Sequence, residues 1–268
     1  MKAPNAETLE RFRVDYAAHR AAEGRALAEA ELLDLPWLRQ GPLARQWRVR
    51  ARTFEAFCDR LVDPMARAMG RSLRILDLGA GNGWLSYRLA SRGHDCTAVD
   101  IRDDGVDGLG AAEVLRARVP FVCLVNAFER LPVADRFADL TVFNAALHYA
   151  TDLRATLAEA SRATRSGGSI VILDSPFYAK DAHGAAMVAE KHARAAERFG
   201  DRAHSLLALP HIEYLTAERL REASASLGLS WRRRRVLYPL WYELRPLAAW
   251  LRGDRPPSRF DIWSAQIP

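Results

Sequence analysis

An apolar run that ends in three alternating glycines constrains the fold of this chain more than any other feature. The run Leu73–Leu78 is followed at once by Gly79, Gly81 and Gly83. Glycine has no Cβ and tolerates positive φ, so the pattern predicts a buried strand, a tight turn and the start of a helix whose N–H groups face a ligand. Asp77 makes the turn unusual, because a loop that holds a pyrophosphate should not place a carboxylate beside the anion. A carboxylate suits a cationic group, such as an amino-acid ammonium.

Strands and helices alternate after this turn. Strands are predicted at residues 73–78, 95–100, 120–125, 138–144, 168–174, 229–236 and 259–267, with helical stretches between most of them. This alternation is typical of an α/β fold, in which a doubly wound and mostly parallel sheet carries helices on both faces. In such a sheet a ligand binds at the carboxyl ends of the first strands.

The N-terminal part of the chain carries helical patterns instead. A first helix is predicted to run to about Ala30, and a second begins near Leu43 after a break rich in proline and glycine. We predict that residues 1–70 form an N-terminal helical extension. The second helix is either an amphipathic helix that docks on the core, or a lid in which Trp47 or Arg50 contacts a ligand carboxylate.

Composition agrees with a globular protein, since 49% of the 268 residues are hydrophobic and 27% are charged. No window approaches the roughly 18 consecutive apolar residues of a membrane helix, and the first residues lack the apolar core of a secretory signal. We therefore predict a cytoplasmic protein with no membrane partner. Cys58, Cys96 and Cys123 lack the spacing of metal ligands and are predicted to be buried, reduced thiols, the last two inside strands.

The net charge of +6 comes from abundant arginine. It indicates either a polyanionic partner such as nucleic acid or a coding bias, and we regard nucleic acid as the less favoured interpretation. The densest run, Arg232–Arg235, lies in a predicted strand, where alternate side chains point to opposite faces. Positive charge on a solvated strand edge protects it against pairing with another chain.

The segment Asp77–Gly83 resembles motif I of the class I S-adenosylmethionine-dependent methyltransferases. Its third glycine comes one residue earlier than in the Gly-x-Gly-x-x-Gly pattern of nicotinamide dehydrogenases. Four further segments resemble the same family in order and spacing: Asp100 at the end of the second strand, Asn126–Pro132 after the third, Phe137–Tyr149 on the fourth strand and its loop, and Ser166–Gly168 before the fifth. The resemblance is strong over residues 72–175 and weak over 210–267.

The loop that begins Asn144-Ala-Ala-Leu resembles the small-molecule branch of the family, similar to methyltransferase types 11 and 25. It lacks the Asn/Asp-Pro-Pro-Tyr pattern of enzymes that methylate nucleobase amines or protein glutamine. The resemblance implies a Rossmann-like sheet of seven strands with the last strand antiparallel. It also implies S-adenosylmethionine as cofactor, S-adenosylhomocysteine as product and no metal.

Cofactor-binding residues follow from the same resemblance. The positions that match are Asp77, Gly79, Ala80, Gly81 and Gly83 for the methionine part, Asp100 for the ribose, Ile101, Asn126, Ala127 and Phe128 for the adenine, and Asn144 near the sulfonium. Many relatives have aspartate where this chain has Asn126. Its amide oxygen can still accept from the adenine amine, and Glu129 is the alternative contact.

Three side chains are candidates for catalysis. His148 follows the fourth strand and has a pKa suited to a general base, which is needed only if the acceptor must lose a proton. Its alternative role is packing or capping. Tyr149 and Tyr178 are candidates to orient the substrate.

The favoured function is methyl transfer to an O-, N- or C-nucleophile of a small molecule by in-line displacement. We expect residues 71–268 to form the S-adenosylmethionine-binding domain, with cap insertions at 175–212 and 237–257. Together with the N-terminal helices, these caps could form a roof over the strand ends that is rich in tryptophan, tyrosine and arginine. Such a roof suits an aromatic or anionic substrate, or else a homodimer interface. The alternatives are an RNA or DNA methyltransferase, and a protein that binds S-adenosylmethionine without methyl transfer.

Overall fold

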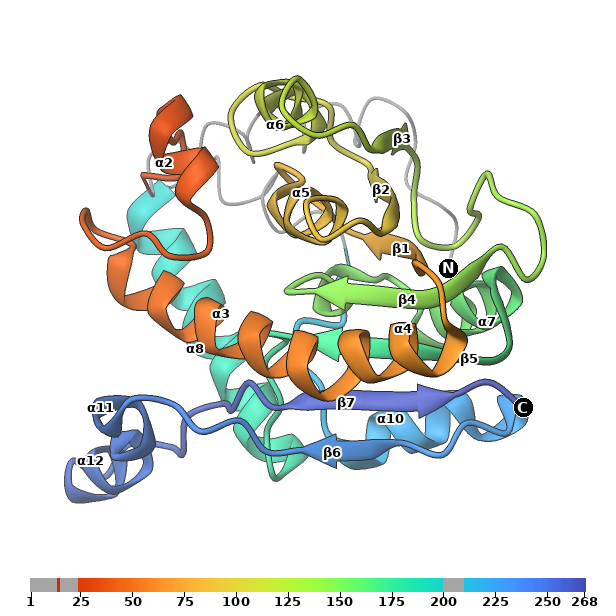
Figure 1. Cartoon of the computed structure of the whole chain (residues 1–268). Coiled ribbons are helices and arrows are strands. Elements are labelled where there is room, and N and C mark those ends of the chain that lie inside the picture. Colours follow the sequence, from red (N-terminus) through yellow and green to blue (C-terminus); the bar gives the residue numbers. More distant parts are fainter. Residues whose placement is uncertain (1–13, 15–23, 200–209) are drawn as a thin grey trace.

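A single seven-stranded sheet forms the centre of the protein (Figure 1). The computed structural model describes residues 14, 24–199 and 210–268. The strands are β1 (Arg74–Leu78), β2 (Asp95–Asp100), β3 (Val122–Val125), β4 (Ala138–Asn144), β5 (Thr164–Leu173), β6 (Arg232–Arg234) and β7 (Ile262–Gln266). Their order is β3-β2-β1-β4-β5-β7-β6, and β7 runs antiparallel to both of its neighbours. The other neighbouring strands pair in parallel, so the predicted sheet is confirmed.

Helices cover both faces of the sheet. The helices are α2 (Glu29–Asp34), α3 (Ala44–Phe57), the π-helical turn η1 (Cys58–Val62), α4 (Asp63–Met69), α5 (Trp84–Ala90), η2 (Leu109–Ala112), α6 (Glu113–Arg116), η3 (Leu147–Tyr149), α7 (Leu153–Ala163), α8 (Asp181–Phe199), α10 (Ala217–Ser224), η5 (Ala225–Leu227), α11 (Leu240–Glu243) and α12 (Arg245–Leu251). Buried side chains of α3, α5 and α6 pack on one face, and those of α7 and α10 pack on the other. This is the doubly wound arrangement that the βα alternation predicts.

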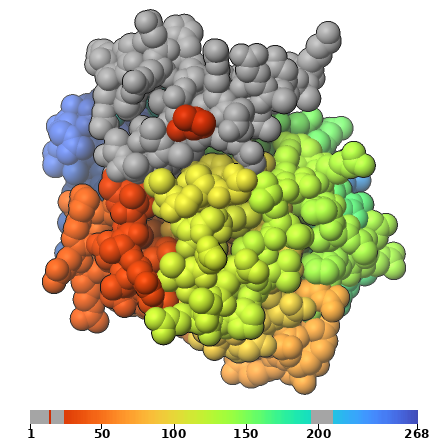
Figure 2. Space-filling view, turned by 90° about the horizontal axis from the view of Figure 1, so that it is seen from above, coloured from red at the N-terminus to blue at the C-terminus, as the bar shows by residue number. Residues whose placement is uncertain are grey.

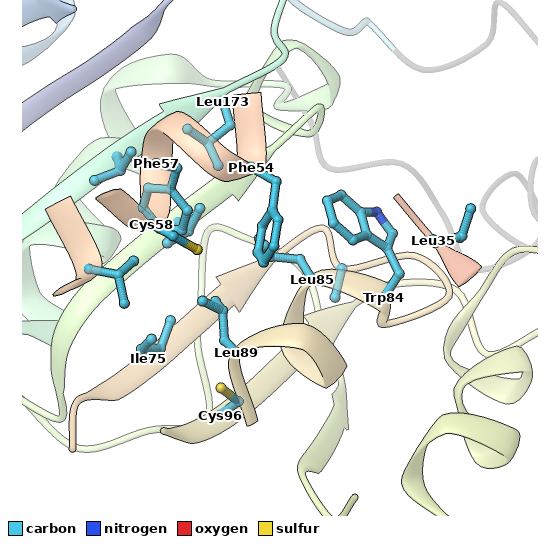
Figure 3. Close-up of a cluster of buried hydrophobic side chains, with 14 of the residues drawn as sticks. Leu35, Phe54, Phe57, Cys58, Ile75, Trp84, Leu85, Leu89, Cys96 and Leu173 are labelled. Carbon is cyan, nitrogen blue, oxygen red and sulfur yellow. The ribbon is translucent and has the colours of Figure 1, made fainter. Parts of the chain in front are cut away.

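The central strands β1, β2, β4 and β5, together with β7, each contribute to two separate cores. Ile75 belongs to the cluster under α3 and α5, whereas Leu76 belongs to the cluster under α7, because successive side chains of a strand point to opposite faces. Figure 3 shows Phe54 and Phe57 from α3 beside Leu89 from α5, above Ile75. The N-terminal helices therefore share their core with the sheet. The division of the chain at residue 70 stays a prediction.

Segments before and after the glycine turn lie side by side on one face of the molecule. Figure 2 shows the region of α2 next to the region of η2 and α6. Arg118, just after α6, forms an ion pair of 3.5 Å with Glu29 of α2. Arg88 of α5 donates to the backbone carbonyls of Leu33 and Leu35 and so holds the end of α2 next to α5.

Two predictions about secondary structure were wrong. The first predicted helix does not reach Ala30, because Gly24 has φ +76° and no helix resumes until Glu29; most of that helix lies outside the described residues. The segment Ser166–Gly168 does not precede the fifth strand but lies inside β5. There the register with β4 shifts and Gly167 has φ +73°, so the segment forms an irregularity within the strand.

The environment of the cysteines differs from one thiol to the next. Cys58 and Cys96 are buried, and burial raises the pKa of Cys58 to about 12. Cys96 lies in β2 and Cys123 in β3, as predicted. Cys123 is only half-buried, which corrects the prediction of a buried thiol, because β3 is the edge strand of the sheet.

The arginine run occupies the opposite edge strand, β6, as the charge pattern predicted. Within the part of the chain that the structure describes, no helix is both long and apolar enough to span a bilayer. Over the same residues, no group of three or more histidine, cysteine, aspartate or glutamate side chains is arranged to hold a metal ion.

Candidate active site

The glycine turn lies at the carboxyl edge of the sheet, pressed against the loop that follows β4. Gly79, Gly81 and Gly83 have φ values of +71°, +54° and +75°, in the left-handed region that favours glycine. A Cβ added to Gly79 would lie 2.3 Å from the Cβ of Ala146 and 3.1 Å from the ring of Phe128. Only glycine fits at this position, because the backbone is packed on two side chains from other loops.

Asp77 is the buried carboxylate beneath the turn. Its Oδ2 accepts a hydrogen bond of 2.8 Å from the hydroxyl of Ser86 on α5. Its Oδ1 is buried and has no hydrogen-bond partner among the described residues. Burial raises the pKa of Asp77 to about 7, and the Ser86 hydrogen bond partly opposes that shift. A cationic donor placed at Oδ1 would satisfy the orphaned atom and favour the ionised form.

Asp100, at the end of β2, connects the turn to the next loop. Its Oδ2 accepts from the backbone N–H of Gly81 at 2.8 Å, and its Oδ1 accepts from that of Arg102 at 2.9 Å. Burial raises the pKa of Asp100, and the two N–H donors oppose that shift. A carboxylate has about four lone-pair sites, so these bonds leave capacity for ligand hydroxyls. Ile101 is half-buried beside it.

The loop after β3 reaches the same place. The backbone N–H of Asn126 donates to the carbonyl of Asp100 at 2.9 Å, and Ala127 after it is exposed. Phe128 meets Phe143 edge to face, with ring centroids 5.8 Å apart. Glu129 points elsewhere, since its carboxylate accepts 3.0 Å from the hydroxyl of Thr151.

The loop after β4 carries two of the three catalytic candidates. It leaves the strand at the buried Asn144, and Ala145 then takes φ +54°. The rings of His148 and Tyr149 lie 4.3 Å apart, and Tyr149 meets His211 edge to face at 5.5 Å. Sequence reasoning did not single out His211. Its Nδ1 lies 2.6 Å from the carbonyl of Tyr149, and burial lowers its pKa.

The third candidate, Tyr178, belongs to a different cluster. It is buried, and its ring lies edge to face with Tyr214 at 6.0 Å. Arg255 donates to the Tyr178 hydroxyl at 3.2 Å and pairs with Glu190 of α8 at 2.8 Å. The two predicted cap insertions are therefore linked to each other through Arg255.

Sequence reasoning also missed a buried polar group at the end of β5, which we call the Thr53–Asp174–Tyr238 node. Thr53 of α3 donates to Oδ1 of Asp174 at 2.7 Å, and its hydroxyl lies 2.8 Å from that of Tyr238. Burial raises the pKa of Asp174, and Arg50 and Thr53 oppose that shift. The available signal was an aspartate at the end of an apolar strand, as at Asp77 and Asp100.

Comparison with known proteins shows which proteins this chain is similar to. Residues 76–172 match the family described as methyltransferase domain. An uncharacterized methyltransferase of Mycobacterium tuberculosis is 39% identical over 98 residues, which are 36% of this chain and 37% of the relative. A malonyl-[acyl-carrier protein] O-methyltransferase of Erwinia pyrifoliae is 31% identical over 102 residues, which are 38% of this chain and 37% of the relative.

Among solved structures, the fold is similar to geranyl diphosphate C-methyltransferase from Streptomyces coelicolor, crystallised with Mg2+, geranyl diphosphate and S-adenosyl-L-homocysteine. The TM-score is 0.62 at 14% identity, and the alignment covers 100% of both chains. Residues 76–172 are therefore similar in sequence to methyltransferase domains, and the whole chain has the fold of a solved methyltransferase, as its motifs predicted. The matched segment spans only 37% of the length of the curated relatives described above.

Proposed function

We propose that this protein transfers a methyl group from S-adenosylmethionine to a small-molecule acceptor. The observation that carries the proposal is the orphaned Oδ1 of Asp77, a buried carboxylate oxygen under a glycine turn at the carboxyl edge of the sheet. A buried carboxylate oxygen without a donor is costly, and a cationic ligand group compensates that cost. The match to the methyltransferase domain over residues 76–172 supports the same function.

The residues around the turn fit the parts of this cofactor. Asp77 would accept from the ammonium of the methionine part, while the backbone of Gly79–Gly83, with Ala80, lets that part approach closely. Asp100 would accept from the ribose hydroxyls. Asn126, Ala127 and Phe128, with Ile101, would surround the adenine. Asn126 is favoured over Glu129, because the Glu129 carboxylate already accepts from Thr151.

S-adenosylmethionine, when bound, supplies an activated methyl group on its sulfonium. The work left to the protein is to align an acceptor nucleophile in line with that methyl group and to exclude water. The loop after Asn144 would pass near the sulfonium. His148 would accept a proton from an acceptor that must lose one, and Tyr149 and Tyr178 would orient the acceptor.

A small acceptor, aromatic or anionic, is favoured over nucleic acid. The arginine run on β6 is partly neutralised, because Arg233 pairs with Asp261 at 2.7 Å and Arg235 pairs with Glu243 at 3.3 Å. A surface that binds nucleic acid needs several cations available for phosphates.

Calorimetry with S-adenosylmethionine, S-adenosylhomocysteine and, as a control ligand, NAD tests the cofactor. We expect binding of the first two and no heat from NAD. Incubation with methyl-labelled S-adenosylmethionine and a panel of small hydroxyl, amine and carboxylate acceptors, with RNA and DNA as further arms, then tests the transfer. Absence of binding by either adenosyl compound would contradict the whole proposal. Label found only in nucleic acid would replace the acceptor class.

A further inference from the structure

Large apolar side chains are exposed together at one corner of the molecule. We call them the leucine–tryptophan patch, and its members with their exposed fractions are Leu237 (71%), Leu240 (72%), Leu244 (45%), Leu247 (53%), Trp250 (74%) and Leu251 (71%). They lie on α11 and α12, except that Leu237 precedes α11 and Leu244 joins the two helices, and both helices stand out from the body of the protein (Figure 1). Isolated exposed leucines are ordinary in soluble proteins, but a contiguous group of this kind marks an interaction surface.

The patch is a regular helical stripe. Leu240, Leu244, Leu247 and Leu251 are spaced four, three and four residues apart, which places them on one side of the α11–α12 segment. The other side is buried, with Tyr242 at 2% and Ala249 at 5% exposure. The segment therefore has two apolar sides, one of which packs on the protein while the other faces outward.

Polar contacts hold the inner side in place. The carboxylate of Glu243 accepts from the backbone N–H of Tyr238 at 3.1 Å and from Arg259 at 2.8 Å. Arg245 donates to the carbonyl of Ser258 at 2.7 Å, and Phe260 donates its N–H to the hydroxyl of Tyr242 at 3.0 Å. These bonds fix the orientation of the helices, so the outward leucines cannot turn inward without breaking them.

Net positive charge lies next to the patch. Residues 232–255 contain seven arginines against Glu243 and Asp254, a formal net charge of +5. Several of these arginines are ion-paired, and when their partners Asp261 and Glu190 and the arginine that shares those partners, Arg259, are included, eight arginines stand against four carboxylates, a net charge of +4. Another cation from α3 lies close by, since the guanidinium of Arg45 stacks 4.1 Å over the ring of Trp241. Leucine and tryptophan on one side with arginine around them are the features of helices that lie in the interface of a membrane with anionic lipids.

We propose that α11 and α12 insert the leucine–tryptophan patch into the surface of an anionic lipid membrane. A nucleic acid would match the charge, but its phosphates offer nothing to the leucines. The earlier prediction of no membrane partner was drawn from the absence of a spanning segment, and peripheral contact of this kind does not require one. The inference does not depend on methyl transfer.

Sedimentation with vesicles tests this proposal. The full chain is mixed with vesicles of equal parts phosphatidylglycerol and phosphatidylcholine, or of phosphatidylcholine alone. We expect it to sediment with the anionic vesicles and much less with the neutral ones. The triple substitution Leu240→Ser, Leu247→Ser and Trp250→Ser should weaken the binding at least about tenfold, because it removes most of the apolar area available for insertion.

The matched control replaces Val122 and Val125 by serine, since both valines are exposed on the edge strand β3, outside the patch. This double variant should sediment like the wild type. All variants are checked for folding by thermal unfolding. The proposal is overturned if the wild-type chain does not sediment with anionic vesicles, or if the triple variant binds them as strongly as the wild type. It is equally overturned if light scattering shows a wild-type dimer that the triple variant dissociates, or if an acyl-carrier protein binds the patch and vesicles do not.

Discussion

The side of the sheet where the parallel strands end has two halves, and these are built in different ways. The glycine-turn half comprises the ends of β1, β2 and β3, where backbone at positive φ meets the buried carboxylate of Asp77 and the half-buried carboxylate of Asp100. The other half comprises the ends of β4 and β5 with α8, α11 and α12, where bulky side chains from distant segments meet. We call it the acceptor half, because we propose that the acceptor binds there. The first half can only hold a ligand that approaches its backbone closely. The second half can change its side chains without disturbing that backbone.

The sharpest test of this contrast is a methyl group added at the turn. Gly79→Ala places a Cβ 2.3 Å from that of Ala146 and also forces an L-residue to φ +71°. We expect a loss of about 2 to 5 kcal/mol in the free energy of unfolding, measured by urea titration, and loss of S-adenosylmethionine binding. Gly93→Ala is the matched control, because Gly93 has φ +88° but no atom near its Cβ position, and it should lose only about 1 to 2 kcal/mol. Equal losses of unfolding free energy in the two variants would show that packing at Gly79 does not matter. If packing does matter, adding Ala146→Gly to the Gly79→Ala variant should recover part of its lost stability.

Asp77→Ala should weaken S-adenosylmethionine binding by about 10- to 100-fold, because a hydrogen bond between charged groups contributes about 1.5 to 3 kcal/mol. Calorimetry measures the change. Asp95→Ala removes an exposed carboxylate one strand away and should leave the affinity unaltered. If affinity survives the loss of Asp77, the assignment of the turn to the methionine part is wrong.

The acceptor half should respond in stability rather than in cofactor affinity. Thr53→Val keeps the shape of the side chain but removes the donor to Asp174, and we expect a loss of about 1 to 3 kcal/mol in the free energy of unfolding. The dissociation constant for S-adenosylmethionine should change less than about twofold, since the node touches no residue of the glycine turn. Thr156→Val is the control, because the buried Thr156 hydroxyl has no hydrogen-bond partner among the described residues and its removal should cost almost nothing. A large effect of Thr53→Val on S-adenosylmethionine affinity would show that the acceptor half also contributes to cofactor binding, against this prediction.

The pH dependence of binding separates the halves further. The pKa of Asp77 is raised to about 7 in the ligand-free protein, whereas an unfolded aspartate titrates near 3.8. Between about pH 4 and pH 7 the Asp77 carboxyl is therefore protonated in the folded protein and ionised in the unfolded protein. For this reason the contribution of Asp77 to the free energy of unfolding falls as pH rises from about 4 to 7. Binding of an ammonium requires the ionised form, so affinity should instead weaken as pH falls below 7, by up to about tenfold per unit. Calorimetry from pH 5 to 7 measures this slope, and Asp77→Asn should flatten it; an unaltered slope in that variant would assign the proton to another group.

The smallest expected effect distinguishes two neighbours in the loop after β3. Asn126→Ala removes one neutral hydrogen bond to the adenine and should weaken S-adenosylmethionine binding by about 2- to 10-fold. Glu129→Gln should leave the affinity within about twofold, because the Glu129 carboxylate is bound to Thr151. The reverse result in calorimetry would move the adenine contact to Glu129.

The glycine-turn half could be predicted from the sequence because its chemistry is local. The strand, the turn and the helix that build it follow one another between Arg74 and Ala90, and the carboxylate and glycines stand where apolar periodicity predicts a strand end. The acceptor half could not be predicted in this way. Thr53 lies 121 residues from Asp174 and 185 from Tyr238, and no local pattern reports that they meet.

Local sequence patterns also failed to predict features that depend on a neighbouring strand or on a distant segment. Ser166–Gly168 has the composition of a turn, yet it lies inside β5 because pairing with β4 continues past an irregular register. The half-buried state of Cys123 depends on β3 being the edge of the sheet, which is a property of strand order. The edge-to-face contact of Tyr149 with His211 likewise depends on a segment that returns to the site from beyond α8.

The position of β7 has a consequence for the order in which the chain becomes structured. This strand is late in the sequence, but it lies between β5 and β6 and supplies hydrogen bonds to both. A ribosome releases the first five strands long before residues 262–266 emerge, so one side of β5 stays unpaired during that interval, and β6 has no partner at all. The sheet therefore closes only after residues 262–266 have been synthesised, and until then the unpaired edge of β5 is the surface that a chaperone would need to cover.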